Sequence, residues 1–224
     1  MYASAFSGAA QVAARCAPAE SVGGDFYQLF RLPGERLGVM IGDVSSHGFS
    51  AALIMALTMS VAAIYAQESG PPAAVLQRIH QALIKELEST EMYVTLFYCV
   101  LDPAAGTLTY ANAGHPHAFR IDADGGVKRL GATDPPLGMS KFEEYGEGRV
   151  DWNAAEDLLA LFTDGLSDAF SNQSSSGGEK KLVAEIVARR HLQLTEIIEQ
   201  LFATAEQASL NIPSDDRTAV LVRG

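Results

Sequence analysis

Short runs of hydrophobic residues, many of them alternating with polar ones, make up most of this chain and predict strands. We expect strands at residues 11–17, 26–32, 37–43, 93–101, 107–111, 118–122, 127–130, 142–150, 157–163 and 218–223. The segments between them are rich in Gly, Pro, Asn and Asp, which are typical of turns. The pattern therefore predicts a β-rich chain in which successive strands form antiparallel hairpins.

Four segments have the residue spacing of helices instead, and they occur in two pairs. The first pair covers residues 51–67, with Ser50 as the expected N-cap, and 73–88. The second pair covers residues 179–190 and 195–208, after a Ser- and Gly-rich stretch that is typical of a flexible connection, residues 171–178. Paired helices favour an α+β fold, with helices covering antiparallel sheets, over a doubly wound parallel fold.

Composition and charge limit the class of protein. The chain has 224 residues, 48% of them hydrophobic, and a formal charge of −11, which together indicate a soluble domain with a sizeable core. This charge, without any run of Lys and Arg, argues against a nucleic-acid partner. No linker divides the chain, so we expect a single domain over residues 1–224. Because domain-like sequence begins soon after Met1, we expect it to be the C-terminal fragment of a longer regulatory protein.

The cellular setting is predicted from the cysteines and the apolar runs. Cys16 and Cys99 lie in strand-like segments without C-x-x-C spacing, which indicates buried free thiols and a reducing cytoplasm. No basic segment followed by an apolar core marks a secretory signal. The longest apolar run, residues 51–66, is shorter than the ~20 residues of a membrane span. We therefore expect a core helix there and no membrane contact from this segment.

Candidate chemistry lies at four aspartates that share one context, a turn at the edge of a strand. They are Asp25, Asp43, Asp164 and Asp215. Carboxylates gathered at strand ends repel one another unless a hard cation neutralises them, and Mg²⁺ or Mn²⁺ suits oxygen ligands. The histidines and cysteines lack the spacing of zinc ligands. The same aspartates are also ordinary turn residues, so the pattern alone leaves both interpretations open.

Seven motifs in order give the chain a family resemblance. They are Pro18-Ala-Glu-Ser-Val-Gly-Gly-Asp-Phe-Tyr27, Gly42-Asp-Val-Ser-Ser-His-Gly48 with Ala51-Ala-Leu53, Tyr93-Val-Thr-Leu-Phe97, Tyr110-Ala-Asn-Ala-Gly-His-Pro116, Pro136-Leu-Gly138, Phe162-Thr-Asp-Gly-Leu166 and Asp215-Asp-Arg-Thr218. Together they resemble the metal-dependent serine/threonine protein phosphatases (PPM family), in the bacterial SpoIIE-like branch. The resemblance covers residues 12–223 and implies an α-β-β-α four-layer sandwich, two antiparallel sheets flanked by helix pairs.

The resemblance also implies a centre of two ions, Mn²⁺ or Mg²⁺. Its metal ligands would be Asp25, Asp43, the backbone carbonyl of Val44, Asp164, Asp215 and, ranked lower, Asp216. Asp43 would bridge the two ions, with Asp25 on one ion and Asp164 and Asp215 on the other. The implied mechanism is direct hydrolysis, in which a water between the metals loses a proton and attacks the phosphorus in line.

Some positions depart from the family pattern or leave their role open. Gln28 stands where relatives often carry an acidic residue, and Ser46 replaces a common glycine. The loop at Asn112 occupies the place of a third-metal ligand in the eukaryotic-type branch, so two metals are expected rather than three. His47 is a candidate general acid, but a turn or substrate-contact role fits it as well. His115 is expected to structure its loop.

The family also implies a substrate and partners. The expected substrate is a phosphoserine or phosphothreonine on a STAS-domain anti-sigma-factor antagonist in a bacterial partner-switching pathway. Control by an N-terminal sensor or receiver domain is expected. The competing hypothesis is a phosphatase-like binding module that has lost catalysis. Gly23-Gly-Asp-Phe-Tyr27 is superficially similar to a diguanylate cyclase signature, but that motif belongs in the middle of an alternating βα domain.

Overall fold

The described part of the chain folds into eleven strands and five helices. The structure, a computed structural model, describes residues 2–6, 10–68, 70–139, 144–171, 175–208 and 215–224. Its strands are β1 (Tyr2–Phe6), β2 (Ala10–Ala17), β3 (Phe26–Leu32), β4 (Arg36–Val44), β5 (Val94–Asp102), β6 (Thr107–Ala113), β7 (Ala118–Ile121), β8 (Val127–Arg129), β9 (Gly148–Asp151), β10 (Leu158–Phe162) and β11 (Arg217–Arg223). Its helices are α1 (Phe49–Gln67), α2 (Pro72–Thr90), α3 (Asp164–Asp168), α4 (Ser175–Arg189) and α5 (Leu194–Ala208).

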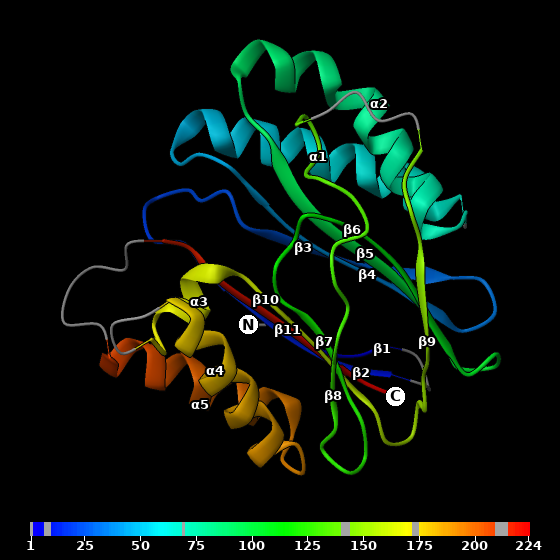
Figure 1. Cartoon of the computed structure of the whole chain (residues 1–224), viewed down its shortest axis with the longest axis vertical. Coiled ribbons are helices and arrows are strands. Elements are labelled where there is room, and N and C mark those ends of the chain that lie inside the picture. Colours follow the sequence, from blue (N-terminus) through cyan, green and yellow to red (C-terminus); the bar gives the residue numbers. More distant parts are fainter. Residues whose placement is uncertain (1, 7–9, 69, 140–143, 172–174, 209–214) are drawn as a thin grey trace.

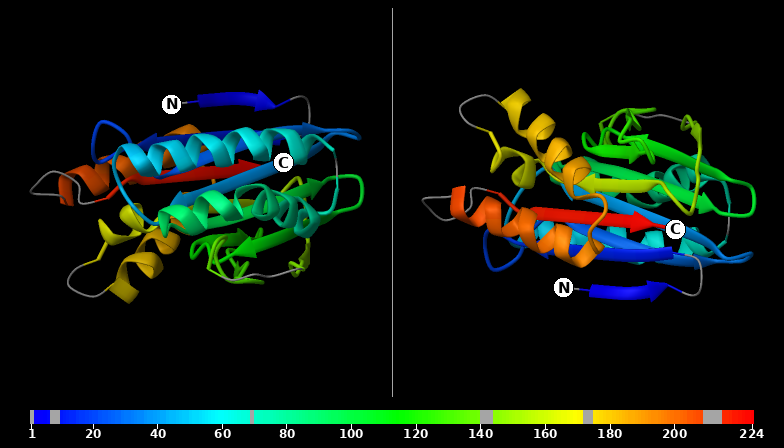
Figure 2. Two further views of the ribbon diagram at one scale, coloured as in Figure 1. Left: turned by 90° about the horizontal axis from the view of Figure 1, so that it is seen from above. Right: turned by 90° about the horizontal axis from the view of Figure 1, so that it is seen from below.

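The strands form two antiparallel sheets that lie face to face (Figure 1). One sheet has six strands in the order β1-β2-β11-β10-β7-β8, and the other has five in the order β3-β4-β5-β6-β9. Helices α1 and α2 cover the outer face of the five-stranded sheet, whereas α4 and α5 cover the six-stranded sheet (Figure 2). The predicted four-layer α+β sandwich is confirmed.

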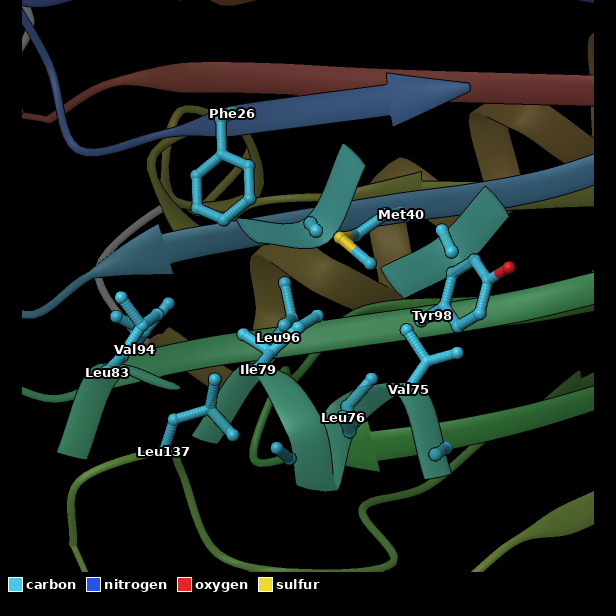
Figure 3. Packing of buried hydrophobic residues seen from close by; sticks show 14 of the residues in the cluster. Phe26, Met40, Val75, Leu76, Ile79, Leu83, Val94, Leu96, Tyr98 and Leu137 are labelled. Atoms are coloured by element: carbon cyan, nitrogen blue, oxygen red, sulfur yellow. The ribbon is translucent and has the colours of Figure 1, made fainter. Parts of the chain in front are cut away.

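Three apolar clusters hold the four layers together. The first lies between the five-stranded sheet and α1 and α2, where Phe26, Met40 and Tyr98 pack with Leu76 and Ile79 (Figure 3). The second lies under α3, α4 and α5, and the third joins the two sheets. Each sheet is therefore buried on both faces, which is why its central strands are almost continuously apolar instead of alternating.

Strand β4 shows this double burial most clearly and leads directly to the candidate site. Leu37, Val39 and Ile41 point into the cluster between the sheets, and Met40 points toward the helices. The apolar pattern stops at Asp43, which is only partly buried. The core thus fixes the backbone up to the residue where the candidate chemistry begins.

Helix α1 differs from the expected core helix because only one of its faces is buried. That face consists of Ala51, Ile54, Thr58, Ala62 and Ala66. Its opposite face exposes Phe49, Leu53, Leu57 and Ile64. By length and composition alone α1 is also apolar enough to cross a membrane, and it is the one such helix in the described part of the chain.

The start of α1 also differs from the prediction. The helix begins at Phe49, after Gly48 with a φ of 80°, so Ser50 lies inside the helix and is not its N-cap. A positive φ is easy for glycine and ends the turn from β4 without a side-chain cap.

Four other elements were predicted incorrectly or missed. Residues 144–147 of the predicted strand 142–150 are not strand, and β9 begins only at Gly148; residues 142 and 143 lie outside the described residues. The predicted flexible connection is helical from Ser175, although residues 172–174 are also outside the described part. The pattern predicted neither β1, which pairs with β2, nor the short helix α3. Cys99 is buried as expected, but Cys16 is exposed.

Candidate metal centre

The strand registers bring the predicted aspartates to one end of the sandwich. In the five-stranded sheet, the end of β4 lies beside the start of β3 and the start of β5. In the six-stranded sheet, the start of β11 lies beside the end of β2 and the end of β10. The turn between β2 and β3 connects these two ends. Asp25, Asp43, Asp164 and Asp215 therefore surround one region where both sheets terminate.

Asp216 holds the turn between β2 and β3 in place. Its carboxylate accepts hydrogen bonds from the backbone N–H of Ala19 (2.8 Å), of Gly24 (2.7 Å) and of Asp25 (3.3 Å). The side chain is buried, and both of its oxygens are used in these contacts. Asp216, the second residue of the Asp-Asp pair, therefore fixes the backbone of the turn that carries Asp25.

Asp25 is buried between the sheets and is held by a threonine that the sequence did not single out. The hydroxyl of Thr163, at the end of β10, donates to Oδ2 of Asp25 at 2.7 Å. The same hydroxyl accepts a hydrogen bond from the backbone N–H of Thr218 at 3.0 Å. Burial raises the pKa of Asp25 to about 7, against the lowering effect of the Thr163 and Thr218 hydrogen bonds. One threonine thus links β10, β11 and Asp25.

Asp43 lies at the electrostatic centre of the group. Burial, followed by the charges of Asp25, Asp164 and Asp215, raises the pKa of Asp43 to about 8. A Cβ atom built on Gly24 would lie 3.0 Å from the carbonyl oxygen of Val44 and 3.1 Å from Oδ1 of Asp43. These two oxygens therefore face the same small space beside the glycine turn.

Asp164 and Asp215 are brought together by a close backbone contact. A Cβ on Gly165 would lie 2.1 Å from the carbonyl oxygen of Asp216 and 3.1 Å from Cβ of Asp215, so only glycine fits there. Both aspartates are exposed. Partial burial raises the pKa of Asp215, and the negative charges of Asp164 and Asp216 raise it further. The start of α3 and the segment before β11 thus lie close together, and each carries an exposed aspartate.

A cleft of about 320 Å³ opens between these segments. Of the predicted residues, it is lined by Asp43, Val44, His47, Asp215 and Asp216. His47 is exposed in the wall of this cleft and follows Ser46, which is also exposed. The cleft is open enough for a phosphorylated side chain, and its walls carry negative charge.

The donor atoms are of the kind that bind a hard divalent cation, although they do not lie close enough together to form a complete coordination shell. Within the described ranges, no three Asp, Glu, His or Cys side chains lie close enough to hold an ion. The chemistry of the donors is nevertheless uniform: carboxylate oxygens with a neighbouring carbonyl, which Mg²⁺ and Mn²⁺ prefer. Burial, the largest cause of the raised pKa values of Asp25 and Asp43, disfavours the charged forms of these carboxyls, which a bound cation would stabilise.

The loop at Asn112 has a structural role, as predicted for His115. The Asn112 side chain accepts from the backbone N–H of His115 (2.7 Å) and donates to the carbonyl oxygens of His115 (2.9 Å) and Leu130 (3.0 Å). His115 is buried, with Nε2 at 3.1 Å from the carbonyl oxygen of Phe162. Burial lowers the pKa of His115 to about 3, so it is a neutral connection between this loop and β10.

Comparison with known proteins identifies the fold and then the family. The chain superimposes on the SiaA-PP2C domain of Pseudomonas aeruginosa with a TM-score of 0.83, 23% identity, and coverage of 95% of this chain and 85% of that one. It also superimposes on the catalytic domain of the serine/threonine protein phosphatase PstP in complex with two manganese ions, with a TM-score of 0.69, 17% identity, and coverage of 96% and 97%. The fold is therefore that of PP2C-type phosphatase domains.

The sequence comparisons are more specific than the fold. The family model described as stage II sporulation protein E (SpoIIE) matches residues 33–224. The phosphoserine phosphatase RsbP of Bacillus subtilis is 33% identical over 65% of this chain and 36% of its own length. The chain belongs to the SpoIIE family of PP2C-type serine/threonine phosphatases. It spans less than half the length of the curated relatives that it matches.

Proposed function

We propose that this chain hydrolyses phosphoserine or phosphothreonine on a protein substrate, with a divalent metal centre at the strand-end aspartates. The observation that carries the proposal is the convergence of Asp25, Asp43, Asp164 and Asp215 at one end of the sandwich, where Asp43 and Asp215 line an open cleft. Burial, followed by the charges of the other three, destabilises the charge on Asp43. Several partly buried carboxylates close together lower the stability of the fold unless a cation binds among them. Carboxyl groups with such raised pKa values are typical of functional sites.

The proposed ligand arrangement assigns a role to each predicted residue. Asp43, in the middle of the group, would contact both ions; Asp25 and the Val44 carbonyl would lie on one side, and Asp164 and Asp215 on the other. When bound, two divalent ions supply positive charge for the phosphoryl group and lower the pKa of a nucleophilic water. We rank Asp216 below the other four aspartates as a ligand, because its carboxylate already accepts three backbone hydrogen bonds that hold the turn between β2 and β3.

The protein contributes rigidity and access. Thr163 fixes one oxygen of Asp25 in a buried position, so the carboxylate is oriented before any ligand binds. The open cleft admits the phosphorylated side chain next to Asp43 and His47. We assign His47 a substrate-contact role in this exposed wall rather than a required proton transfer.

The proposed substrate class is a phosphorylated STAS-domain protein in a partner-switching pathway. The relative RsbP carries the name phosphoserine phosphatase, which supports a phosphoserine substrate. We further propose that residues 1–224 are one catalytic domain under the control of an N-terminal sensor or receiver domain, and that it acts in the cytoplasm, where its two free cysteines stay reduced.

An inactive phosphatase-like binding module is the second candidate, favoured by Gln28 in place of an acidic residue. In the structure Gln28 donates to the carbonyl oxygen of Met59 at 3.1 Å, so this position attaches α1 to β3. All four aspartates of the centre are retained, and for that reason we prefer the active enzyme.

Phosphate release from a phosphoserine protein, measured with Mn²⁺ or Mg²⁺ and with EDTA, tests the proposal. We expect metal-dependent release by the wild-type chain and at least a hundredfold loss in Asp43→Asn, in line with the ~10²–10³-fold effect of removing one preorganised charge-stabilising group. Asp102→Asn is the matched control, because Asp102 is a partly buried aspartate at the opposite end of the same sheet. Metal binding without release from any phosphoprotein would support the binding module instead.

A further inference from the structure

A second polar cluster lies beside the metal centre and has no role in the function described so far. His117, in the segment between β6 and β7, is buried, with its ring stacked on Phe162 at 4.8 Å between centroids. Its Nδ1 lies 2.8 Å from Oε2 of Glu179 in α4. Arg129 of β8 forms an ion pair with the other oxygen of Glu179 and donates to the carbonyl of Pro116 at 2.6 Å.

The other side of the imidazole leads to a predicted metal ligand. His117 Nε2 lies 3.3 Å from the hydroxyl oxygen of Ser167, which is in α3. The Ser167 hydroxyl in turn lies 3.0 Å from the carbonyl oxygen of Asp164, the first residue of the same helix. A continuous row of hydrogen-bonding groups therefore runs from Glu179 through His117 and Ser167 to the backbone of Asp164.

The backbone contact between the two helices shows how closely α4 lies against α3. A Cβ on Gly178 would lie 2.1 Å from the carbonyl oxygen of Ser167, so α4 can approach only because this position is glycine. Glu179 is the next residue. The short helix α3 has only five residues and cannot hold its own position by helix propensity, so contacts from outside must orient it.

Two simpler roles do not account for the cluster. A nucleophilic serine with a histidine and a carboxylate would need an accessible hydroxyl, but Ser167 is buried. A residue that only filled space between α3 and α4 would be apolar, whereas both ring nitrogens of the buried His117 face a polar partner. The row of contacts instead has one end in α4 and the other at a residue of the metal centre.

We propose that His117, held by Glu179 of α4, is a positioning residue for Asp164 and acts through the hydroxyl of Ser167. The inference rests on the proposed function, because it takes Asp164 as a metal ligand. Glu179 and Arg129 fix the imidazole, the imidazole fixes Ser167, and Ser167 fixes the first turn of α3. Without these contacts Asp164 is still present, but its orientation toward a bound ion is no longer fixed.

The expected consequence is a weaker metal site with little change in the chemical step. Outer residues that orient metal ligands typically change affinity about 10–100-fold, and we expect about tenfold weaker Mn²⁺ binding in His117→Phe. At saturating Mn²⁺ the site is filled, so kcat should stay within about twofold of the wild type. His117→Phe keeps an aromatic ring next to Phe162 and removes both nitrogens.

Calorimetric titration of the purified chain with Mn²⁺ tests this inference, alongside phosphate release as a function of Mn²⁺ concentration. Glu179→Gln is the second variant, because it removes the negative charge with which Glu179 holds Arg129 and His117, and it should weaken Mn²⁺ binding in the same direction. His80→Phe is the matched control: His80 is buried and hydrogen-bonded to Tyr145 (2.8 Å), but it lies in α2. This control should bind Mn²⁺ like the wild type.

Each result decides between the alternatives. Weaker Mn²⁺ binding in both His117→Phe and Glu179→Gln, with kcat retained and His80→Phe unaffected, supports the positioning role. Wild-type affinity in a folded His117→Phe or, should that variant fail to fold, in Glu179→Gln overturns it while leaving the proposed function intact. A wild-type chain that binds no Mn²⁺ overturns the proposed function, and the inference falls with it.

Discussion

At the scale of single residues, Asp215 and Asp216 are neighbours in sequence with different tasks. Asp216 is buried and accepts three backbone hydrogen bonds from the turn between β2 and β3. Asp215 is exposed at the mouth of the cleft, where its contact is with the backbone N–H of Asp216. The motif predicted a pair of acidic residues here, and their contacts separate the buried residue that holds the turn from the proposed ligand.

Replacing each of these aspartates by asparagine separates the two roles. Asp216→Asn places an amide donor against backbone N–H groups, so we expect it to lower the free energy of unfolding by about 2–3 kcal/mol in metal-free buffer. Asp215→Asn should change that quantity by less than about 0.5 kcal/mol but weaken Mn²⁺ binding. Urea denaturation and Mn²⁺ titration of both variants measure the difference. Equal destabilisation by the two would contradict the assignment.

Thr163 gives a second prediction at this scale. Thr163→Val keeps the side-chain shape but removes the donor to Asp25 and the acceptor for Thr218, so we expect about tenfold weaker Mn²⁺ binding. Thr163→Ser retains the hydroxyl and serves as the control, with affinity close to wild type. If Thr163→Val bound Mn²⁺ as tightly as Thr163→Ser, the hydrogen bond from Thr163 to Asp25 would not contribute to metal affinity.

At the scale of elements, α1 has two apolar faces and only one of them is packed. Ile54 belongs to the face buried against the sheet, and Leu53, the preceding residue, is half exposed. The continuous apolar pattern of this helix cannot tell the two faces apart, since period-3.6 alternation with polar residues is missing. The position of the helix on the sheet decides which residues contribute to stability.

Two alanine substitutions at adjacent positions measure this asymmetry. Ile54→Ala should lower the free energy of unfolding by about 2–5 kcal/mol, the usual cost of emptying a packed position. Leu53→Ala should cost less, about 1 kcal/mol or below, because about half of the Leu53 side chain stays in contact with water in the folded state. Chemical denaturation of the isolated chain compares the two. A similar loss in both variants would show that the exposed face of α1 is covered in solution.

The sequence predicted elements with strong local patterns and missed those that depend on distant contacts. Paired helices and long apolar strands were predicted because periodicity and turn residues are local signals. The first turn of α4 contains Ser and Gly, which favour a loop, but its Gly178 is there to let the helix pack against Ser167. Likewise, β9 is shorter than the predicted strand because its pairing with β6 begins only at Gly148.

At the scale of the whole molecule, two sheets end at the same place and collect negative charge between them. The family motifs located the aspartates, and the registers explain why they meet. Thr163 and His117 could not be predicted in the same way, because their partners are distant along the chain: Asp25 for Thr163, and Glu179 for His117. The roles of Thr163 and His117 follow from their contacts in the folded structure and not from their spacing in the sequence.

The gathered charge predicts an unusual pH dependence for the metal-free chain. Because the pKa values of Asp25 and Asp43 are raised to about 7 and about 8, the folded state binds their protons more tightly than the unfolded state. Their contribution to stability is therefore largest below the unfolded value of about 4 and is lost as the pH rises through 7 and 8.

Asp43→Asn, which removes the titrating group, makes this prediction measurable. In EDTA at pH 8 we expect this variant to be more stable than the wild type by roughly 1–3 kcal/mol, after allowance for solvent screening, and the advantage should shrink at pH 5. Urea denaturation at both pH values provides the comparison. A wild-type chain as stable as the variant at pH 8 would show that the carboxylates do not strain the metal-free fold.

The number of Mn²⁺ ions bound per chain tests the central claim most directly. Calorimetric titration should give two ions for the wild type, one for Asp164→Asn, and none for Asp43→Asn at concentrations that saturate the wild type, because Asp43 is assigned to both ions. Asp102→Asn should bind two ions. Unchanged binding of two ions by a folded Asp43→Asn would contradict the account of Asp43 as the shared ligand of a two-metal phosphatase centre.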